Sequence, residues 1–268
     1  MKAFAIDPPS RMLVRVLVPV FVPVLVSLTT PALADMRTPS DPTMRAAKTA
    51  TDQGDLAQAV TLYKEAADQG QASAASELAR LYLEGGTGLT PDYAAAADWA
   101  ERAAQGGDSR GYLYLGKIYM DGLGVPVDTA KAKDYFHKGE AAGDMKAPRY
   151  LGLIAKAEGD DKTAATWFAE AAEAGDITSQ FYLGQAYETG AGVPQDYTQA
   201  LYWYRKSAAR DDLIGSNGMV GEAGLYARGL GVAQDPARAK ALYTKAAAFG
   251  NPKAQAALAA LPDAASAP

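Results

Sequence analysis

The chain has 268 residues, of which 49% are hydrophobic and 21% are charged, and its formal net charge is −5. This composition is too apolar for a disordered protein, and the acidic balance argues against general nucleic-acid binding, which normally uses a basic surface. Cysteine is absent, which excludes disulfides, thiolate nucleophiles, zinc–thiolate sites and a lipid anchor on an N-terminal cysteine. Abundant alanine favours helix over strand.

Residues 1–34 have the features of a cleavable signal peptide. Basic residues precede an apolar run at 16–28, which contains two prolines and is shorter than the roughly 20 residues that a membrane-spanning helix needs. The Ala-Leu-Ala sequence that ends at Ala34 supplies the small residues read by a signal peptidase. We therefore expect cleavage between Ala34 and Asp35 and a periplasmic product, with secretion as the alternative. Residues 35–42 are expected to form an N-terminal linker.

The rest of the chain consists of one motif that recurs at intervals of 32 to 39 residues. A period in this range is typical of stacked helix pairs. Each interval begins at a marker residue, and a leucine follows eight residues later in four units, with a tyrosine four residues further in three. The i, i+4 spacing places both side chains on one helical face. The markers are Gly70, Gly107, Gly143, Gly175, Asp211 and Gly250; the leucines are Leu78, Leu115, Leu151 and Leu183; the tyrosines are Tyr82, Tyr119 and Tyr187.

A turn and a second helix complete each long unit. Paired glycines, as in Gly122-Leu123-Gly124-Val125, stop the first helix. Four residues beyond the second glycine stands an aspartate, which we interpret as the N-cap of the second helix. An alanine then allows close helix contact, and a large residue three positions later is expected to fill the gap between layers. The aspartates are Asp92, Asp128, Asp196 and Asp235, and the large residues are Trp99, Tyr135, Trp203 and Leu242. Their recurrence favours a role in folding over a catalytic or cofactor-binding role.

This order of Leu-Gly, Tyr, Gly-x-Gly-Val, Asp, Ala and an aromatic pair resembles the Sel1-like repeat family, a relative of the tetratricopeptide repeat. The resemblance covers about residues 43–250. It implies an all-α fold, a right-handed solenoid of six stacked antiparallel helix pairs. Residues 251–268 are then expected to form a capping helix and a disordered tail.

Three units depart from the repeat pattern. Residues 43–70 and 144–175 replace the long turn with a short Gly-Asp turn and look like ordinary tetratricopeptide repeats. The sixth unit has three extra residues near 213–219 and has Glu222 where leucine is expected, so its first helix is the least regular of the predicted elements.

Few residues support catalysis. Ser109 lies in the one G-x-S-x-G match, between Gly107 and Gly111, and the only histidine is His137. A nucleophile elbow requires a strand before the serine, whereas this serine falls in a turn between two repeats. A lone histidine cannot form a zinc site without carboxylates in register. We therefore expect no enzyme activity, no cofactor and no metal, and hydrolysis is a remote alternative.

A candidate binding surface lies on the first helices, which line the concave face in solenoids of this type. Positions five before, two before and two after the core leucine share a face roughly opposite the leucine–tyrosine side. This face is expected to present basic and apolar side chains to an acidic protein partner, with a solvated face of mixed charge as the alternative. The predicted partner-binding residues are Arg80, Arg110, Leu113, Lys117, Lys146, Arg149, Phe181 and Gln185.

The resemblance also implies a function. Exported Sel1-like proteins include regulators of exopolysaccharide synthesis that bind a sensor kinase, and scaffolds of polysaccharide secretion. The chain is therefore expected to be a non-enzymatic periplasmic adaptor or regulator whose partner is a membrane sensor domain or an envelope assembly component. The alternative is a scaffold that binds envelope polysaccharide or peptidoglycan through Tyr114, Tyr150 and Tyr182. No nucleic-acid partner and no stable membrane insertion after processing are expected.

Overall fold

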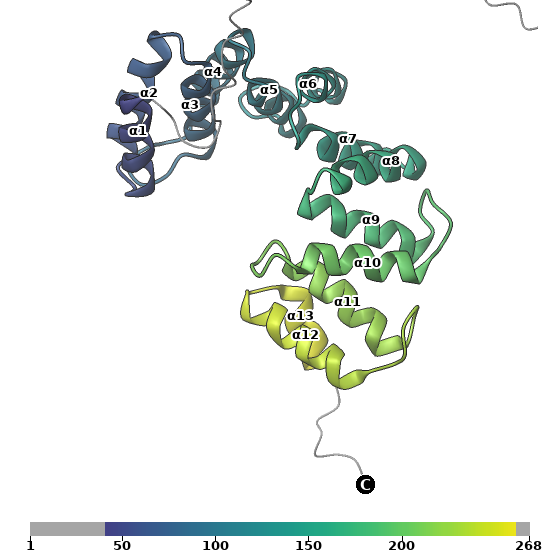
Figure 1. The fold of residues 1–268 in the computed structure, drawn as a ribbon. Helices are drawn as coiled ribbons and strands as arrows, with labels where there is room; N and C mark the ends of the chain where they lie inside the picture. The colour runs from purple at the N-terminus through teal and green to yellow at the C-terminus, as the bar shows by residue number, and fades with distance from the viewer. Residues whose placement is uncertain (1–40, 261–268) are drawn as a thin grey trace, which may run out of the picture. The chain divides into compact units, whose positions relative to one another are not determined.

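A computed structural model of the protein describes residues 41–260, which form thirteen α-helices and contain no strand beyond one isolated bridge (Figure 1). The helices are α1 Pro42–Asp52, α2 Leu56–Asp68, α3 Ala72–Glu84, α4 Tyr93–Gln105, α5 Arg110–Asp121, α6 Thr129–Ala141, α7 Ala147–Ala157, α8 Asp161–Glu173, α9 Ile177–Thr189, α10 Tyr197–Ala208, α11 Ser216–Arg228, α12 Pro236–Ala248 and α13 Pro252–Ala259. The expected signal peptide, its cleavage site after Ala34 and the tail beyond residue 260 lie outside the described residues.

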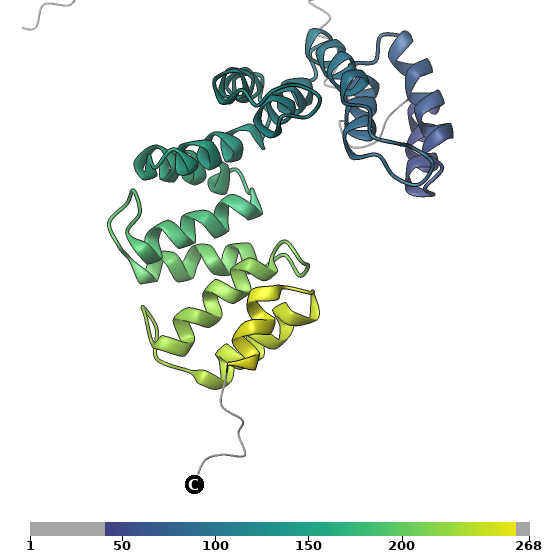
Figure 2. The same cartoon turned by 180° about the vertical axis from the view of Figure 1, so that it is seen from behind.

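Each helix packs against the helices that precede and follow it in sequence (Figures 1 and 2). Short turns connect them, so α1 to α12 form six antiparallel pairs, and α13 packs on α12. First helices of neighbouring pairs also meet, as α3 does with α5 and α9 with α11. The predicted all-α fold of stacked helix pairs is confirmed.

The predicted aspartate caps begin the second helices. In α6, a side-chain oxygen of Asp128 accepts a hydrogen bond from the backbone N–H of Lys131 at 2.9 Å. The backbone N–H of Asp128 in turn donates to the carbonyl oxygen of Tyr119, in α5, at 2.9 Å. One residue therefore caps one helix and fastens it to the previous one. The same two bonds occur at Asp92, Asp196 and Asp235, and the short units use Asp55 and Asp160 as caps.

The helices of a pair approach closely because a glycine of the first helix lies against an aromatic ring of the second. The contacting pairs are Gly116 with Phe136, Gly152 with Phe168, and Gly184 with Tyr204. These three rings are buried, whereas the side chains one position earlier, such as Tyr135 and Trp203, are only half-buried. Trp99, Tyr135 and Trp203 pack against buried clusters, as the prediction that they fill the gap between layers requires, but in the units of Tyr135 and Trp203 the fully buried ring is one position later, at Phe136 and Tyr204.

The sixth unit has a regular first helix, α11, despite its divergent sequence. Glu222 occupies the position of the core leucine, and its side chain is only 6% exposed. The carboxylate is tolerated there because it accepts a hydrogen bond from Arg205 Nε at 3.0 Å and lies 3.5 Å from Nη2 of Arg238.

Candidate functional site

The predicted binding face contains paired rather than free arginines in its first units. Arg80 Nε lies 3.0 Å from Glu77 Oε2 on the same helix, and Arg110 Nη1 of α5 lies 2.6 Å from Glu77 Oε1. One carboxylate thus binds two of the predicted cations and joins α3 to α5. Since both arginines are also half-buried, they contribute less free positive charge than the sequence suggested.

Asp108 completes this network at the start of α5. Its carboxylate accepts hydrogen bonds from Ser76 Oγ at 2.8 Å and from Arg110 Nη2 at 2.7 Å. Burial acts to raise the pKa of Asp108, but the hydrogen bonds and positive charge of Arg110 outweigh it and hold the pKa below its usual range. The network therefore connects neighbouring repeats through an ionised carboxylate.

Arg149, one unit after Arg110, is also held by an ion pair. Its Nη1 lies 2.8 Å from Asp176 Oδ2, and the two side chains are 17% and 11% exposed. Asp176 also caps α9 by accepting a hydrogen bond from the backbone N–H of Ser179 at 2.7 Å. Arg149 therefore connects α7 to α9 and presents little surface to a partner.

The two remaining predicted cations are Lys117, which is half-buried, and Lys146, which is exposed. Neither side chain has an ion pair or a hydrogen bond with another residue of the described range 41–260. The structure thus places all five cations on first helices or at their start, but leaves only these two free for an acidic partner.

The apolar and amide residues of the predicted face differ in accessibility. Leu113 is only 4% exposed, because α7 covers it with Ala147 and Leu151 in a common hydrophobic cluster. Its predicted contact with a partner is therefore corrected to a core role. Phe181 is half-buried, with its ring 5.9 Å from that of Tyr204, and Gln185 lines a small hollow.

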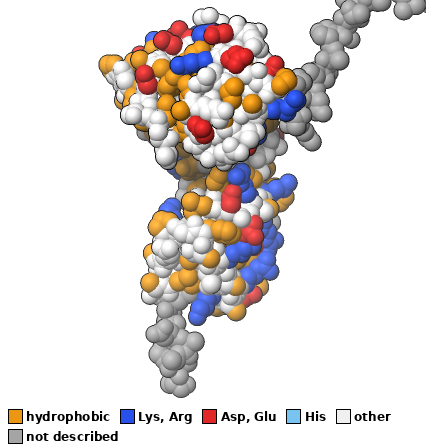
Figure 3. Space-filling view, turned by 90° about the vertical axis from the view of Figure 1, so that its left-hand side faces the viewer, with side chains coloured by type: hydrophobic (Ala, Val, Ile, Leu, Met, Phe, Trp, Pro, Cys, Tyr) orange, Lys and Arg blue, Asp and Glu red, His pale blue; other side chains and the backbone are white. Residues whose placement is uncertain are grey.

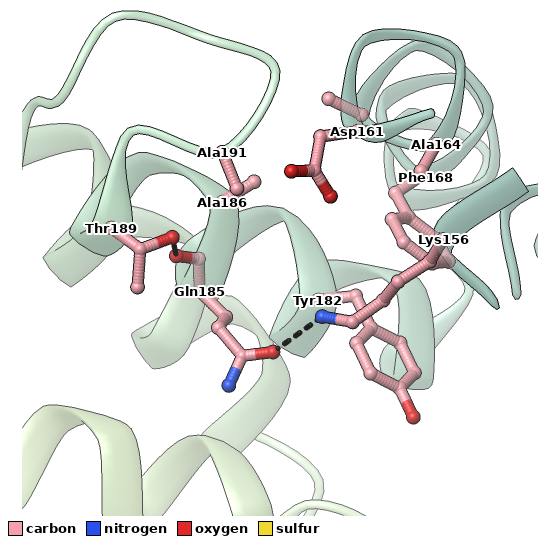
Figure 4. A pocket seen from close by; sticks show the side chains of 10 residues that line it. Lys156, Asp161, Ala164, Phe168, Tyr182, Gln185, Ala186, Thr189 and Ala191 are labelled. Atoms are coloured by element: carbon pink, nitrogen blue, oxygen red, sulfur yellow. Dashed lines mark hydrogen bonds between the residues drawn. The ribbon is translucent and has the colours of Figure 1, made fainter. Parts of the chain in front are cut away.

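This hollow lies between α7, α8 and α9, and its floor includes Phe168 and alanines (Figure 4). Lys156 Nζ donates to Gln185 Oε1 at 3.0 Å and lies 5.3 Å from the centre of the Tyr182 ring. The carboxylate of Asp161 faces the hollow from the opposite side (Figure 4). A cation, an amide and a carboxylate around an apolar floor can accept a polar side chain of a partner, but the hollow contains no nucleophile with an adjacent base.

The tyrosines of the polysaccharide alternative contribute to the core. Tyr114 is 8% exposed, and burial raises its pKa to about 12. The rings of Tyr150 and Tyr182 stack on the buried rings of Phe136 and Phe168 at 4.9 and 4.8 Å. Only Tyr150 and Tyr182 are partly exposed, so the three do not offer a common open stacking surface to a sugar.

The candidate catalytic residues do not form a catalytic arrangement. Ser109 lies in a helical conformation at the start of α5, and no strand precedes it within residues 41–108. His137 is exposed and contacts the edge of Trp167, with the ring centres 5.6 Å apart. In residues 41–260, no three potential ligands among His, Asp and Glu gather where they could hold a metal ion. No helix of this same range is long and apolar enough to cross a membrane.

A second charged region lies at the C-terminal end of the array and was not predicted. Residues 41–196 contain 14 Lys and Arg against 24 Asp and Glu, a net charge of −10, whereas residues 197–260 contain 8 against 4, a net charge of +4. Figure 3 shows Lys and Arg side chains gathered on the lower part of the molecule, where the C-terminal helices lie. Counting charge unit by unit would have revealed this region in the sequence.

At its centre, two arginines from different helices meet over α11. Arg205 of α10 and Arg238 of α12 share the carboxylate of Glu222, and both guanidinium groups lie over the ring of Tyr226, 5.8 and 4.6 Å from its centre. Their side chains remain 46% and 51% exposed. Because two cations share one carboxylate, the cluster keeps an excess of positive charge and free guanidinium donors at the surface.

Comparisons with known proteins agree with this architecture. A family model for the Sel1 repeat matches residues 50–71, 72–108, 109–144, 150–176, 177–212 and 219–251. The chain is 33% identical over 154 residues to the chitin synthase regulator SKT5 of Saccharomyces cerevisiae, a match that covers 58% of this chain and 18% of that protein. The chain therefore spans less than a fifth of this curated relative.

Two solved structures are similar over most of the array. A protective antigen of uropathogenic Escherichia coli, c5321, which displays an SLR fold, is 31% identical with a TM-score of 0.66, and the match covers 81% of this chain and 47% of that one. A Sel1 repeat protein from Oxalobacter formigenes is 27% identical with a TM-score of 0.62, over 70% and 75% of the two chains. An immunity protein of Pseudomonas aeruginosa, at 20% identity and a TM-score of 0.55 over 81% and 84% of the two chains, shares the fold.

Proposed function

The chain belongs to the Sel1 repeat family, and from this premise we propose that it is a non-enzymatic adaptor that holds a protein partner after export to the periplasm. Sel1 repeats are in general non-catalytic scaffolds for protein–protein interaction. The observation that carries the proposal is the extent of the array: helix pairs occupy nearly all of residues 41–260. The surfaces that these helices present are therefore what the described part of the chain offers to other molecules.

The expected signal peptide supports the periplasmic location. The apolar run at 16–28 and the Ala-Leu-Ala sequence that ends at Ala34 have the length and the small residues of an exported precursor. Secretion to the medium is the alternative. Within the envelope, the proposed partner is the sensory domain of a membrane kinase or a component of an envelope assembly.

A regulatory role is favoured over direct polysaccharide binding. The yeast relative is a chitin synthase regulator, which supports a regulatory task near a polysaccharide-forming system. Against direct binding, Tyr114 is buried and the rings of Tyr150 and Tyr182 each have a face covered by a phenylalanine. Stacking on sugar rings would need open aromatic faces.

Site-specific photocrosslinking in the native host tests the proposal. The full chain is expressed with a photoreactive amino acid at position 117, 156 or 213, one position per strain, and periplasmic extracts are examined after irradiation. We expect at least one position to yield a covalent complex with a single protein. We also expect the intact mass of the exported chain to match a chain that begins at Asp35. The absence of any protein adduct at all three positions, or adducts with glycan alone, would refute the adaptor. A mature chain that retains residues 1–34 would refute the proposed location.

A further inference from the structure

The turn between α10 and α11 exposes large hydrophobic side chains. Leu213 is 56% exposed and Ile214 is 44% exposed. They are two of the five exposed large hydrophobic residues in the described range. This turn belongs to the unit with three extra residues, so the apolar side chains protrude where the repeat pattern is broken. Exposed apolar groups gathered in one place are typical of interaction sites.

The backbone of this turn is held in place by charged residues. Asp212 Oδ1 accepts hydrogen bonds from the backbone N–H groups of Ile214, at 2.9 Å, and Gly215, at 3.0 Å. Asp212 Oδ2 accepts a hydrogen bond from Arg210 Nε, and Asp211 pairs with Lys245 of α12 at 2.8 Å. Leu213 and Ile214 are therefore presented in a fixed geometry, which lowers the entropy lost when a partner binds.

The arginine cluster extends from this turn along α12. Arg238 and Lys245 are seven residues apart, two helical turns, and so lie on the same face of α12. Arg238 reaches Glu222 beside Arg205, and Lys245 reaches Asp211 beside Leu213. We call the surface made by Arg205, Leu213, Ile214, Arg238 and Lys245 the C-terminal docking face.

We propose that the C-terminal docking face binds an acidic segment of a protein partner, with Leu213 and Ile214 packing on apolar side chains of that segment and the arginines pairing with its carboxylates. This inference rests on the proposed adaptor function and locates its site. Charge complementarity favours an acidic occupant, because the net charge of residues 197–260 is +4 while the rest of the described array is −10. The exposed apolar side chains favour a protein over a purely charged polymer, since protein interfaces combine an apolar centre with arginine and a polar rim.

The first test measures binding of two fluorescent synthetic peptides to the purified full chain by fluorescence anisotropy. One peptide is rich in glutamate and contains two leucines, and the other has lysine in place of every glutamate. We expect the acidic peptide to bind and the lysine peptide not to bind, and we expect binding to weaken as salt rises from about 0.05 to 0.3 M, because exposed charges are screened. Equal binding of both peptides would overturn the proposal.

Two variants with matched controls locate the site. Leu213→Ser with Ile214→Ser removes the apolar side chains, and Val127→Ser with Met145→Ser is its control, because these residues are similarly exposed elsewhere, at 64% and 70%. We expect the first double variant to weaken acidic-peptide binding about tenfold, which is roughly 1.4 kcal/mol. The control should leave binding unchanged. Equal effects of the two would refute the site.

The charge variant is Arg238→Gln, and its control is Lys131→Gln. Both residues stand three positions after the capping aspartate, and both place their cation over the tyrosine before the turn, 4.6 Å from the Tyr226 ring and 4.0 Å from the Tyr119 ring. Arg205 still pairs with Glu222 in the variant, so folding should be retained and is checked by circular dichroism. We expect Arg238→Gln to weaken binding of the acidic peptide at least threefold, and Lys131→Gln to leave it unchanged. Unchanged binding in this variant would overturn the role of the arginines.

Two further outcomes separate this inference from the adaptor itself. A protein adduct from the photoreactive residue at position 117 but not at 213 would leave the adaptor standing and refute the docking face. Self-association of the chain that is abolished by the Leu213 and Ile214 substitutions would also refute it, because a second copy would then be the occupant; sedimentation velocity measures this.

Discussion

A Cβ atom placed on Gly116 would lie 2.5 Å from Cε1 of Phe136, well inside ordinary van der Waals contact. The ring is fully buried against the glycine, so neither side has room to move. Gly116→Ala should therefore force the ring or the helix away and lower the free energy of unfolding by about 1–3 kcal/mol. Urea denaturation followed by circular dichroism measures the change.

Gly224→Ala is the matched control, because Gly224 also lies inside a first helix but its added Cβ would meet nothing closer than 3.5 Å. There the better helix propensity of alanine should raise stability by about 0.5–1 kcal/mol. If both substitutions shift the urea midpoint of unfolding in the same direction, the contact between Gly116 and Phe136 does not set the spacing of α5 and α6.

Glu222→Leu restores the leucine of the repeat and should leave the stability unchanged or raise it by about 1–4 kcal/mol. The reason is that leucine removes the desolvation cost of the buried carboxylate, while Arg205 and Arg238 are about half exposed and stay hydrated without it. Glu222→Ala, which in addition leaves a cavity, should lower the midpoint instead. Thermal unfolding of both variants checks the prediction, and a Leu variant less stable than the Ala variant would contradict it.

Asp108→Asn should destabilise the chain at neutral pH and change its response to acid. Because the pKa of Asp108 is lowered in the folded state, its ionised form adds stability above the unfolded value of about 3.9, and this contribution is lost as pH falls through the folded pKa. The difference in unfolding midpoint between wild type and variant should thus be large at pH 7 and shrink below about pH 4.

Asp144→Asn serves as a comparison, because the pKa of Asp144 is shifted in the opposite direction to that of Asp108. Burial raises the pKa of Asp144, so its ionised form is disfavoured in the folded state and the Asn variant should lose little or gain stability at pH 7. Midpoints measured across pH 3–7 for both variants distinguish the two cases. Parallel curves would show that neither carboxylate is perturbed as described.

Neither the wild-type chain nor Ser109→Ala should hydrolyse a substrate through this residue, because Ser109 lies at a helix start without an adjacent histidine or strand. The exported chain and the variant are assayed against ester, peptide and β-lactam substrates. Turnover that disappears with this single change would overturn the non-enzymatic adaptor.

Local features of the fold were predictable from the sequence. The aspartate caps at Asp92, Asp128, Asp196 and Asp235 and the glycine turns depend on contacts within a few residues, and such contacts leave a spacing that can be read along the chain. The core leucines were predictable for the same reason, since one helical face repeats every three to four residues. Which ring of the pairs Tyr135-Phe136 and Trp203-Tyr204 is fully buried was not predictable in this way, because both members of an aromatic pair suit a core.

The ion pairs that join neighbouring repeats could not be predicted, because their partners are distant in sequence. Arg110 and Glu77 are 33 residues apart, and a helical-face argument gives the direction of a side chain but not the residue opposite it. The sequence by itself therefore determined the helix pairs, their caps and their order. Only the tertiary structure decided that Arg149 is held by Asp176 while Arg205 and Arg238 share Glu222, because neighbouring repeats must pack before such side chains meet.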